Sequence, residues 1–445
     1  MSAEILALAI IAIIVIIYVL CDFSNNNNSK DLIYFDNNAT TIPPPIVGRE
    51  IQRWLGTGNP SNPNCPSHQM LKDSKQFLYD YMGLNPRVYD LIWTSGASES
   101  NALFIRSVVE NYKINHGIQP HVVISSIEHK SIMNLCEMLD GMGCITYSMV
   151  DVDSRGQVCP SDIENVINHK TCLVSIMWAN NEVGTINNIP AIAALCKRKR
   201  IPFHSDATQT FGKFDLNIAQ PIDGVSMSFH KTYGLSGIGL LVCAKRMKIH
   251  SQIAGEQNGK LRGGTENVAG IASAIAGIKY MISSPGRSIK NARLEGLKNS
   301  LIAGISDTSG GGWPLVAYED ILTTRLVDNI SPVELTILGA SPFNNVPGLP
   351  NTLALAVVKH TGRRFCNVTL KKDLADAGVI VSIGSACSSG TGKKSHVLQG
   401  MGVPDIIQCG VIRISFSDQN QMYEVDAFID KFKKCVSKQL GDIQS

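Results

Sequence analysis

Four short apolar runs in this sequence are each followed by polar side chains that could take part in catalysis. The runs cover residues 121–126, 171–179, 201–207 and 224–229. The polar residues at their ends are Ser126–His129, Asn180–Glu182, Asp206–Gln209 and His230–Lys231. A lysine that directly follows an apolar strand is partly desolvated, which lowers the pKa of its amine and makes it a Schiff-base nucleophile. Because an isolated lysine is far more often an exposed loop residue, the prediction for Lys231 depends on its neighbours.

Those neighbours favour a pyridoxal phosphate (PLP) site. Asp206 could lie under a pyridinium nitrogen and keep it protonated, which strengthens the electron sink of that cofactor. Gln209 could form a hydrogen bond to the oxygen on the cofactor ring. Residues Thr94–Asn101 contain a glycine turn before a predicted helix, and the N–H groups and dipole of a helix start suit a phosphate. The turn alone is weak evidence, because serine and glycine cap many helices that bind nothing.

Strand patterns alternate with helix patterns along the body of the chain. A fifth strand candidate covers 237–244, and helix patterns cover 131–142 and 189–200. This alternation predicts βαβ units, a mostly parallel sheet and helices on both of its faces. Ligands of such sheets bind beyond the carboxyl ends of the strands, where the polar residues above are placed. We therefore predict an α/β protein with a large domain at 46–285 and a smaller α+β domain at 286–445.

Nine motifs, all in the same order, give the chain a resemblance to a known family. They are YFDNNATT (34–41), TSGASESNA (94–102), EHKSI (128–132), NNEVGTINNI (180–189), HSDATQTFGK (204–213), SFHKTYGLSGIG (228–239), RGGTENVAG (262–270), GSACSSGTG (384–392) and VIRISFS (411–417). On these motifs the sequence resembles the cysteine desulfurases, the NifS-like members of the class V aminotransferase group. The resemblance implies a PLP enzyme of fold type I, usually a homodimer, that converts L-cysteine to L-alanine and retains the sulfur.

The resemblance also implies roles for the matching residues. Lys231 would hold the cofactor as a Schiff base, His129 would stack on its ring and shuttle protons, and Asp206 would pair with the ring nitrogen. The other cofactor contacts would come from Ala97, Ser98, Asn181, Gln209, Ser228 and His230, and from Thr265 of the neighbouring subunit. Arg413 would bind the substrate carboxylate near Asn181, a task that suits a bidentate guanidinium better than an amine.

Cys387 would carry the distinguishing chemistry of the family. It would attack the sulfur of the bound substrate as a thiolate and retain that sulfur as a persulfide. Its surroundings, GSACSSGTGKK, are rich in glycine and serine, a composition that gives the thiol the reach it needs. The sulfur would then pass to an acceptor, such as an iron–sulfur scaffold or a tRNA-thiolation protein.

Composition excludes several other classes of protein. With 44% apolar residues among 445, the chain is not mostly disordered. A formal net charge of +3 gives no basic surface for nucleic acid. The 12 cysteines are irregularly spaced and contain no CxxC pair, so we predict neither a disulfide framework nor a metal site. Such cysteines fit a reducing compartment.

The first 22 residues are predicted to be a membrane anchor. Residues 5–21 contain no charged side chain, and a run of about 17 apolar residues is just long enough to span a bilayer. Lys30 follows the run and no basic residue precedes it, which favours a cytosolic catalytic body. Residues 23–45 would form a linker and the N-terminal arm of the small domain. We therefore predict a single-pass, membrane-tethered homodimer.

Two other functions remain open on the sequence. The first is another PLP enzyme of the same fold, such as a selenocysteine lyase or a carbon–sulfur lyase with other substrates. The same site residues would serve each of these reactions, although Cys387 favours persulfide formation. The second is a catalytically idle protein that keeps the fold for binding. The intact set of Lys231, His129, Asp206, Cys387 and Arg413 argues against that alternative.

Overall fold

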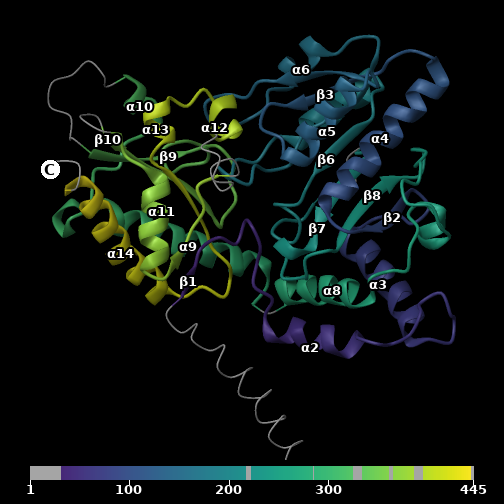
Figure 1. Cartoon of the computed structure of the whole chain (residues 1–445), viewed down its shortest axis with the longest axis horizontal. Helices are drawn as coiled ribbons and strands as arrows, with labels where there is room; N and C mark the ends of the chain where they lie inside the picture. Colours follow the sequence, from purple (N-terminus) through teal and green to yellow (C-terminus); the bar gives the residue numbers. More distant parts are fainter. Residues whose placement is uncertain are drawn as a thin grey trace, which may run out of the picture.

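A seven-stranded sheet forms the centre of the larger half of the molecule, on the right of Figure 1. The computed structural model describes residues 32–216, 222–283, 285–323, 333–359, 364–384 and 394–441. The strand order is β2-β8-β7-β6-β5-β3-β4. Strand β8 is antiparallel to both β2 and β7, and the other neighbouring pairs are parallel. The strands are β2 (Tyr89–Thr94), β3 (His121–Ser125), β4 (Thr146–Val150), β5 (Thr171–Ser175), β6 (Phe203–Asp206), β7 (Gly224–Ser228) and β8 (Gly239–Ala244).

Helices cover both faces of this sheet, because alternate side chains of its strands are apolar on each side. Val122 and Ile124 pack in one hydrophobic cluster with α4 and α5, whereas Val123 belongs to the cluster on the opposite face. Strands that are buried on both faces are typical of parallel sheets in α/β proteins. The helices of this half are α2 (Pro45–Trp54), α3 (Pro66–Met82), α4 (Ala97–His116), α5 (Lys130–Gly141), α6 (Pro160–Val166), α7 (Ile189–Lys199) and α8 (Val268–Ile282).

The smaller half contains an antiparallel sheet with the order β12-β10-β9 and a short parallel pair of β1 and β11. Its main hydrophobic cluster packs the sheet against α9, α11 and α14. Its strands are β1 (Ile33–Tyr34), β9 (Val333–Leu338), β10 (Thr352–Lys359), β11 (Val379–Ile380) and β12 (Val411–Ser415). Its helices are α9 (Arg287–Ser306), α10 (Tyr318–Thr323), α11 (Asn367–Asp376), α12 (His396–Gly400), α13 (Asp405–Gln408) and α14 (Met422–Gly441).

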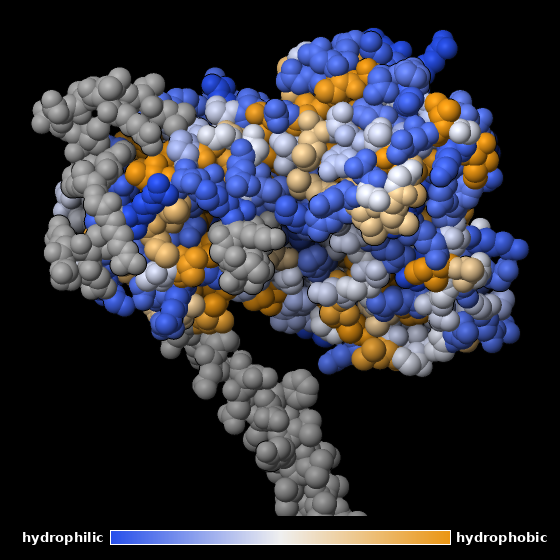
Figure 2. Space-filling model, turned by 45° about the horizontal axis from the view of Figure 1, so that its top comes forward, coloured by the Kyte–Doolittle hydropathy of each residue, from blue (hydrophilic) through white to orange (hydrophobic). Residues whose placement is uncertain are grey.

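The two halves share a hydrophobic cluster where they meet. Met177 and Val183, which follow β5, pack there with Ala354 and Val358 of β10. This cluster fixes the carboxyl edge of the large sheet against the small sheet. Between the two halves the surface is hollowed and mostly hydrophilic, as the space-filling view shows (Figure 2).

The fold predicted from the sequence is confirmed in its coarse form, an α/β protein with a mostly parallel central sheet. The five predicted strands correspond to β3, β5, β6, β7 and β8, and the two predicted helices to α5 and α7. The sequence patterns gave no prediction for β2, which is mostly buried, or for β4, where only Val150 is buried. The predicted domain limits stay predictions.

The prediction of a single-pass membrane protein with a cytosolic body needs correction. A spanning helix requires about 20 apolar residues, and within the described ranges no helix is both long and apolar enough to cross a bilayer. The apolar helix α8 has 15 residues and packs in the protein interior. The residues on which the prediction depended, 5–21, lie outside the described part of the chain.

Candidate active site

A cavity of about 620 Å³ lies where the carboxyl edge of the large sheet faces the small half. The predicted residues that line it are Ala97, Ser98, His129, Asn181, Asp206, Gln209, Ser228, His230, Lys231 and Arg413. They come from the ends of four parallel strands, from the start of α4 and from β12. The sheet topology thus brings together residues that are widely separated in the sequence, as expected for ligand sites in α/β proteins.

The start of α4 offers an anion site at one end of the cavity. Gly96 is the N-cap of the helix, and Ala97 and Ser98 are its first residues. The turn lies directly against β8, since a Cβ atom on Gly239 would be 2.5 Å from the main chain of Gly96. Glycine is therefore required at this contact. The first turn of this 20-residue helix lines the cavity, and the N–H groups at a helix start have no partner within the helix, an arrangement that suits a phosphate group.

Lys231 ends the short 3₁₀ turn that follows β7, and its side chain lines the cavity. Burial lowers the pKa of its amine to about 8, with Asp206 opposing the shift and Arg413 adding to it. The amine is therefore closer to its neutral, nucleophilic form than an exposed lysine would be. The pKa of the adjacent His230 falls to about 4 through burial and the charges of Lys231 and His129, so this imidazole is neutral at physiological pH.

A hydrogen-bonded chain links Asp206 to His129. Asn101 Nδ2 donates to Asp206 Oδ2 at 2.9 Å and to Ser131 Oγ at 3.0 Å. The main-chain N–H of Ser131 donates to His129 Nδ1 at 3.2 Å, so Nδ1 is the acceptor and Nε2 carries the proton of the neutral ring. Burial lowers the pKa of His129, with Asp206 opposing that shift.

Asp206 is buried but keeps its negative charge. Burial alone would raise the pKa of this carboxyl, but the hydrogen bonds from Thr208 and Asn101, together with His129, hold it below its usual value. The main-chain N–H of Thr208 donates to Asp206 Oδ1 at 3.0 Å. A buried carboxylate of this kind is suited to stabilise a cationic nitrogen in the cavity. The adjacent Gln209 Oε1 and Thr208 Oγ1 are buried without a partner among the described residues, so further polar contacts are available to a bound group.

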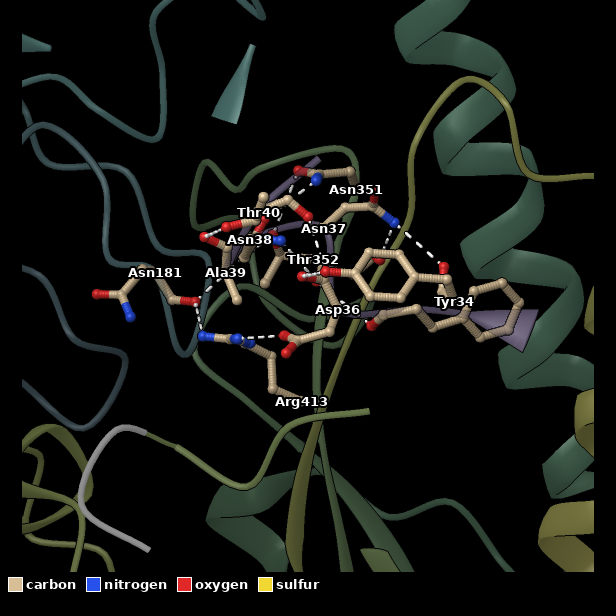
Figure 3. Close-up of polar contacts among 12 residues, drawn as sticks. Tyr34, Asp36, Asn37, Asn38, Ala39, Thr40, Asn181, Asn351, Thr352 and Arg413 are labelled. Atoms are coloured by element: carbon tan, nitrogen blue, oxygen red, sulfur yellow. Dashed lines mark hydrogen bonds and ion pairs between the residues drawn. The ribbon is translucent and has the colours of Figure 1, made fainter. Parts of the chain in front are cut away.

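Arg413 of β12 lines the cavity from the small half, and Figure 3 shows its contacts with Asp36 and Asn181. Its Nη2 pairs with Asp36 Oδ1 at 2.5 Å, and its Nη1 donates to the main-chain oxygen of Asn181 at 3.1 Å. Its Nε is buried without a partner in the described structure. The guanidinium is therefore held from two sides and retains donor capacity.

One predicted site residue lies outside the cavity, and another falls outside the described part of the chain. Thr265 is exposed and does not line the cavity of its own chain. The turn before it is tied to the start of α4, because Arg262 forms an ion pair of 2.8 Å with Glu99. Cys387 lies outside the described residues.

The structure adds residues that sequence reasoning did not single out. Asp36 pairs with Arg413, and Lys371 also lines the cavity. Glu128 is fully buried beside His129, and burial raises its pKa to about 8, so its carboxyl is protonated at neutral pH. Lys213 is a buried lysine close to Lys231, which is itself half-buried. The motifs around 34–41, 128–132 and 204–213 contain three of these residues, but no spacing rule indicates their contacts.

Comparisons with known proteins identify the family of this chain. Residues 33–313 match the family model for aminotransferase class V. The cysteine desulfurase IscS of Clostridium botulinum is 32% identical over 359 residues, which is 80% of this chain and 81% of the relative.

The chain belongs to the cysteine desulfurases of the class V aminotransferase family.

Solved structures support the assignment. A NifS-like protein, 29% identical, superimposes with a TM-score of 0.74 over 92% of this chain and 100% of its own. SspA in complex with cysteine, 25% identical, gives a TM-score of 0.67 over 87% of this chain and 100% of its own. The desulfurase therefore has the fold type I of PLP enzymes, and PLP is its cofactor. The residues fit this group: a helix start for the phosphate, a buried carboxylate for the ring nitrogen and a partly desolvated lysine for the aldehyde.

Proposed function

We propose that this protein removes the sulfur of L-cysteine, releases L-alanine and transfers the sulfur through Cys387 to an acceptor protein. The observation that supports this most directly is one cavity that contains Lys231, Asp206 and Arg413 together. A reaction of PLP with an amino acid needs an amine to hold the cofactor, a carboxylate beside the ring nitrogen and a cation for the substrate carboxylate. Lys231, Asp206 and Arg413 are the residues suited to these three tasks. The structural neighbour SspA, which was solved with cysteine, supports the choice of substrate.

Arg413 would bind the carboxylate of the substrate. Its guanidinium is already oriented by Asp36 and by the Asn181 carbonyl, so little side-chain order is lost when the substrate binds. A charge-assisted pair of this kind is stronger than a neutral hydrogen bond. The Asp36 carboxylate also balances the charge of the arginine, which favours a zwitterionic amino acid over a ligand with additional negative charge.

Lys231 would hold the cofactor between turnovers and move the Cα proton during the reaction. PLP supplies an aldehyde for amines and a ring that takes up an electron pair, and Asp206 supports that ring as the residue beneath its nitrogen. An amine with a pKa of about 8 is well matched to accept and return a proton near neutral pH. His129, with its proton on Nε2, would assist as a donor toward the substrate.

Cys387 would complete the sulfur transfer. Its thiolate attacks the substrate sulfur, the S–S bond forms and the C–S bond breaks. The electron pair of the broken bond stays on the substrate carbon, which takes up a proton and leaves as alanine. The persulfide then passes its outer sulfur to an acceptor, for which an iron–sulfur scaffold or a tRNA-thiolation protein is the expected class.

We further propose that the active unit is a homodimer in which Thr265 completes the phosphate site of the other subunit. The exposure of Thr265 beside the start of α4 supports this arrangement. A mostly apolar groove of about 770 Å³ between α2, α3 and α8 is a suitable contact surface for the second copy. Light scattering at several protein concentrations tests the oligomeric state, and a monomer with full activity would contradict the proposal.

The function is tested on the full-length enzyme loaded with PLP. We expect L-cysteine, added without reductant, to increase the intact mass by one sulfur atom and to release alanine. The gain should vanish in Cys387→Ser and persist in Cys159→Ser, which removes an exposed cysteine that does not line the cavity. A mass gain that survives Cys387→Ser contradicts the role of that cysteine. Turnover of L-selenocysteine but not of L-cysteine would favour the selenocysteine lyase alternative.

A further inference from the structure

Asn38 lies at the seam between the two halves, in the turn after β1 (Figure 3). Its side chain is buried, with 1% of its surface exposed. The turn is fixed to β12, because Asn38 N donates to Ser415 Oγ at 2.9 Å and Asn37 N donates to Ser415 O at 3.2 Å. The segment that contains Asn38 is thus attached to the strand that contains Arg413.

The side chain of Asn38 joins the two halves through both of its polar atoms. Its Nδ2 donates to the main-chain oxygen of Asn181 in the large half at 3.2 Å, and to Thr352 Oγ1 in the small half at 2.7 Å. Its Oδ1 accepts from Asn351 Nδ2 at 3.1 Å. A buried amide that makes all these contacts fixes the distance between the elements that it joins.

The contacts of Asn38 lead to residues on both sides of the cavity. Its main-chain oxygen accepts from Gln209 Nε2 at 3.1 Å. The Asn181 oxygen that accepts from Asn38 also accepts from Arg413 Nη1 at 3.1 Å. Asn38 therefore bonds directly to Gln209, and it also bonds to the Asn181 carbonyl that accepts from Arg413. Among the residues that line the cavity, it connects the cofactor side with the arginine side.

We propose that Asn38 is a positioning residue that sets the distance between Arg413 and the cofactor side of the cavity. This inference rests on the proposed function, in which the carboxylate of an amino acid binds Arg413 while its amine reacts at the other wall. The distance between the amine and the carboxylate is fixed within the substrate. A small displacement of one cavity wall therefore weakens binding of the substrate. Asn38 acts through Asn181, Gln209 and Arg413.

The test is Asn38→Ala in the full-length, PLP-loaded enzyme. Loss of the three side-chain hydrogen bonds of Asn38 should raise KM for L-cysteine by about tenfold, with kcat within about threefold. The dissociation constant of L-alanine, measured by calorimetry, should rise by a similar factor because alanine shares the amine and carboxylate of the substrate. An unchanged KM and unchanged alanine affinity would overturn the proposal.

Asn37→Ala is the matched control. Asn37 is the neighbouring residue of the same type, is 2% exposed, and donates to Ser415 O at 2.9 Å and Tyr34 O at 3.2 Å. None of its side-chain partners lines the cavity. We expect a comparable loss of thermal stability with KM within about twofold of wild type. Equal increases in KM for the two variants would show general loosening and contradict a specific role of Asn38.

Thr352→Val provides a second, milder variant if Asn38→Ala does not fold. It keeps the shape of the side chain and removes one acceptor of Asn38, so KM should rise by about threefold. An unchanged KM in Thr352→Val, together with an unfolded Asn38→Ala, would count against the proposal. If the wild-type enzyme binds L-alanine but does not turn over L-cysteine, the proposed function is wrong. The alanine affinities of the variants would still decide the role of Asn38.

Discussion

The two walls of the cavity are built in different ways. On the large-half wall, His129, Asp206 and Lys231 each lie within a few residues of the end of a strand in one sheet. On the opposite wall, Arg413 is held by Asp36, which is 377 residues away in the sequence. Asn38 contacts Thr352 across 314 residues. The first wall is made by local motifs, and the second by contacts between distant parts of the chain.

This difference separates reactivity from placement. The large-half wall changes the pKa of its groups, since burial lowers that of the Lys231 amine and hydrogen bonds keep Asp206 ionised. On the small-half wall, the ion pair and hydrogen bonds of Arg413 fix its geometry. We therefore expect substitutions on the first wall to lower kcat and those on the second to raise KM.

The largest effect is expected for Lys231→Ala. This change removes the amine that would hold the cofactor and move the Cα proton, so alanine release should fall by about 10⁴-fold. The measurement is alanine release from L-cysteine at saturating substrate, with cofactor content determined separately by absorbance.

Lys213→Met is the matched control for Lys231→Ala. Lys213 is a buried lysine whose Nζ donates to the main-chain oxygen of Gln209 at 2.9 Å. It does not line the active-site cavity. We expect less than about a tenfold loss of activity for this variant. If the two variants lost activity to a similar extent, Lys231 could not be distinguished from a buried lysine that takes no part in the reaction.

The large-half wall was predictable from the sequence because its signals are local. Apolar runs of six or seven residues, at 121–126, 201–207 and 224–229, placed the ends of β3, β6 and β7 to within one residue. Parallel pairing then brings those ends to one edge of the sheet. The glycine turn at Thr94–Asn101 likewise predicted a helix start, which the structure places at Ala97, in the lining of the cavity.

A smaller effect, on binding, is expected for Arg413→Lys. A lysine amine cannot contact Asp36, the Asn181 carbonyl and a substrate carboxylate in the planar arrangement that a guanidinium provides. KM for L-cysteine should rise by roughly 10- to 100-fold, with a smaller change in kcat. Steady-state kinetics with L-cysteine measure both constants.

Arg246→Lys controls for the loss of an arginine–carboxylate pair outside the cavity. Arg246 pairs with the buried Asp223 at 2.5 Å, but neither residue lines the active-site cavity. The KM of the Arg246→Lys variant for L-cysteine should equal that of wild type. If Arg413→Lys lowered kcat and left KM unchanged, the small-half wall would take part in reactivity, and the comparison of the two walls would be wrong.

The contacts of the small-half wall could not be predicted from the sequence. Asp36 and Arg413 meet because β12 pairs with the segment after β1, as the bridge between Asp36 and Ser415 shows. No periodicity within either segment specifies this pairing. The resemblance of the motif at 411–417 to a family predicted the arginine itself, but not the carboxylate beside it. The same holds for Lys213, whose burial follows from the packing around Phe211.

The smallest effect concerns the pKa of Lys213, which is buried behind the large-half wall. Burial, with a contribution from Lys231, lowers the pKa of Lys213 from 10.5 to about 7. Between these two values the unfolded chain binds a proton at this lysine that the folded protein does not bind. The free energy of unfolding therefore gains a contribution that rises with pH in this window and is constant below it. Methionine at the same position has no such contribution.

Lys213→Met should therefore be more stable relative to wild type at about pH 7 than at about pH 9.5. Urea unfolding of both proteins at the two pH values measures the difference, and contributions from groups common to both proteins largely cancel. Parallel pH dependences would mean that Lys213 is ionised in the folded state. In that case the protein would hold the charged amines of Lys213 and Lys231 close together. Burial would then not explain the low pKa of Lys231, because both lysines lie in the same desolvated surroundings.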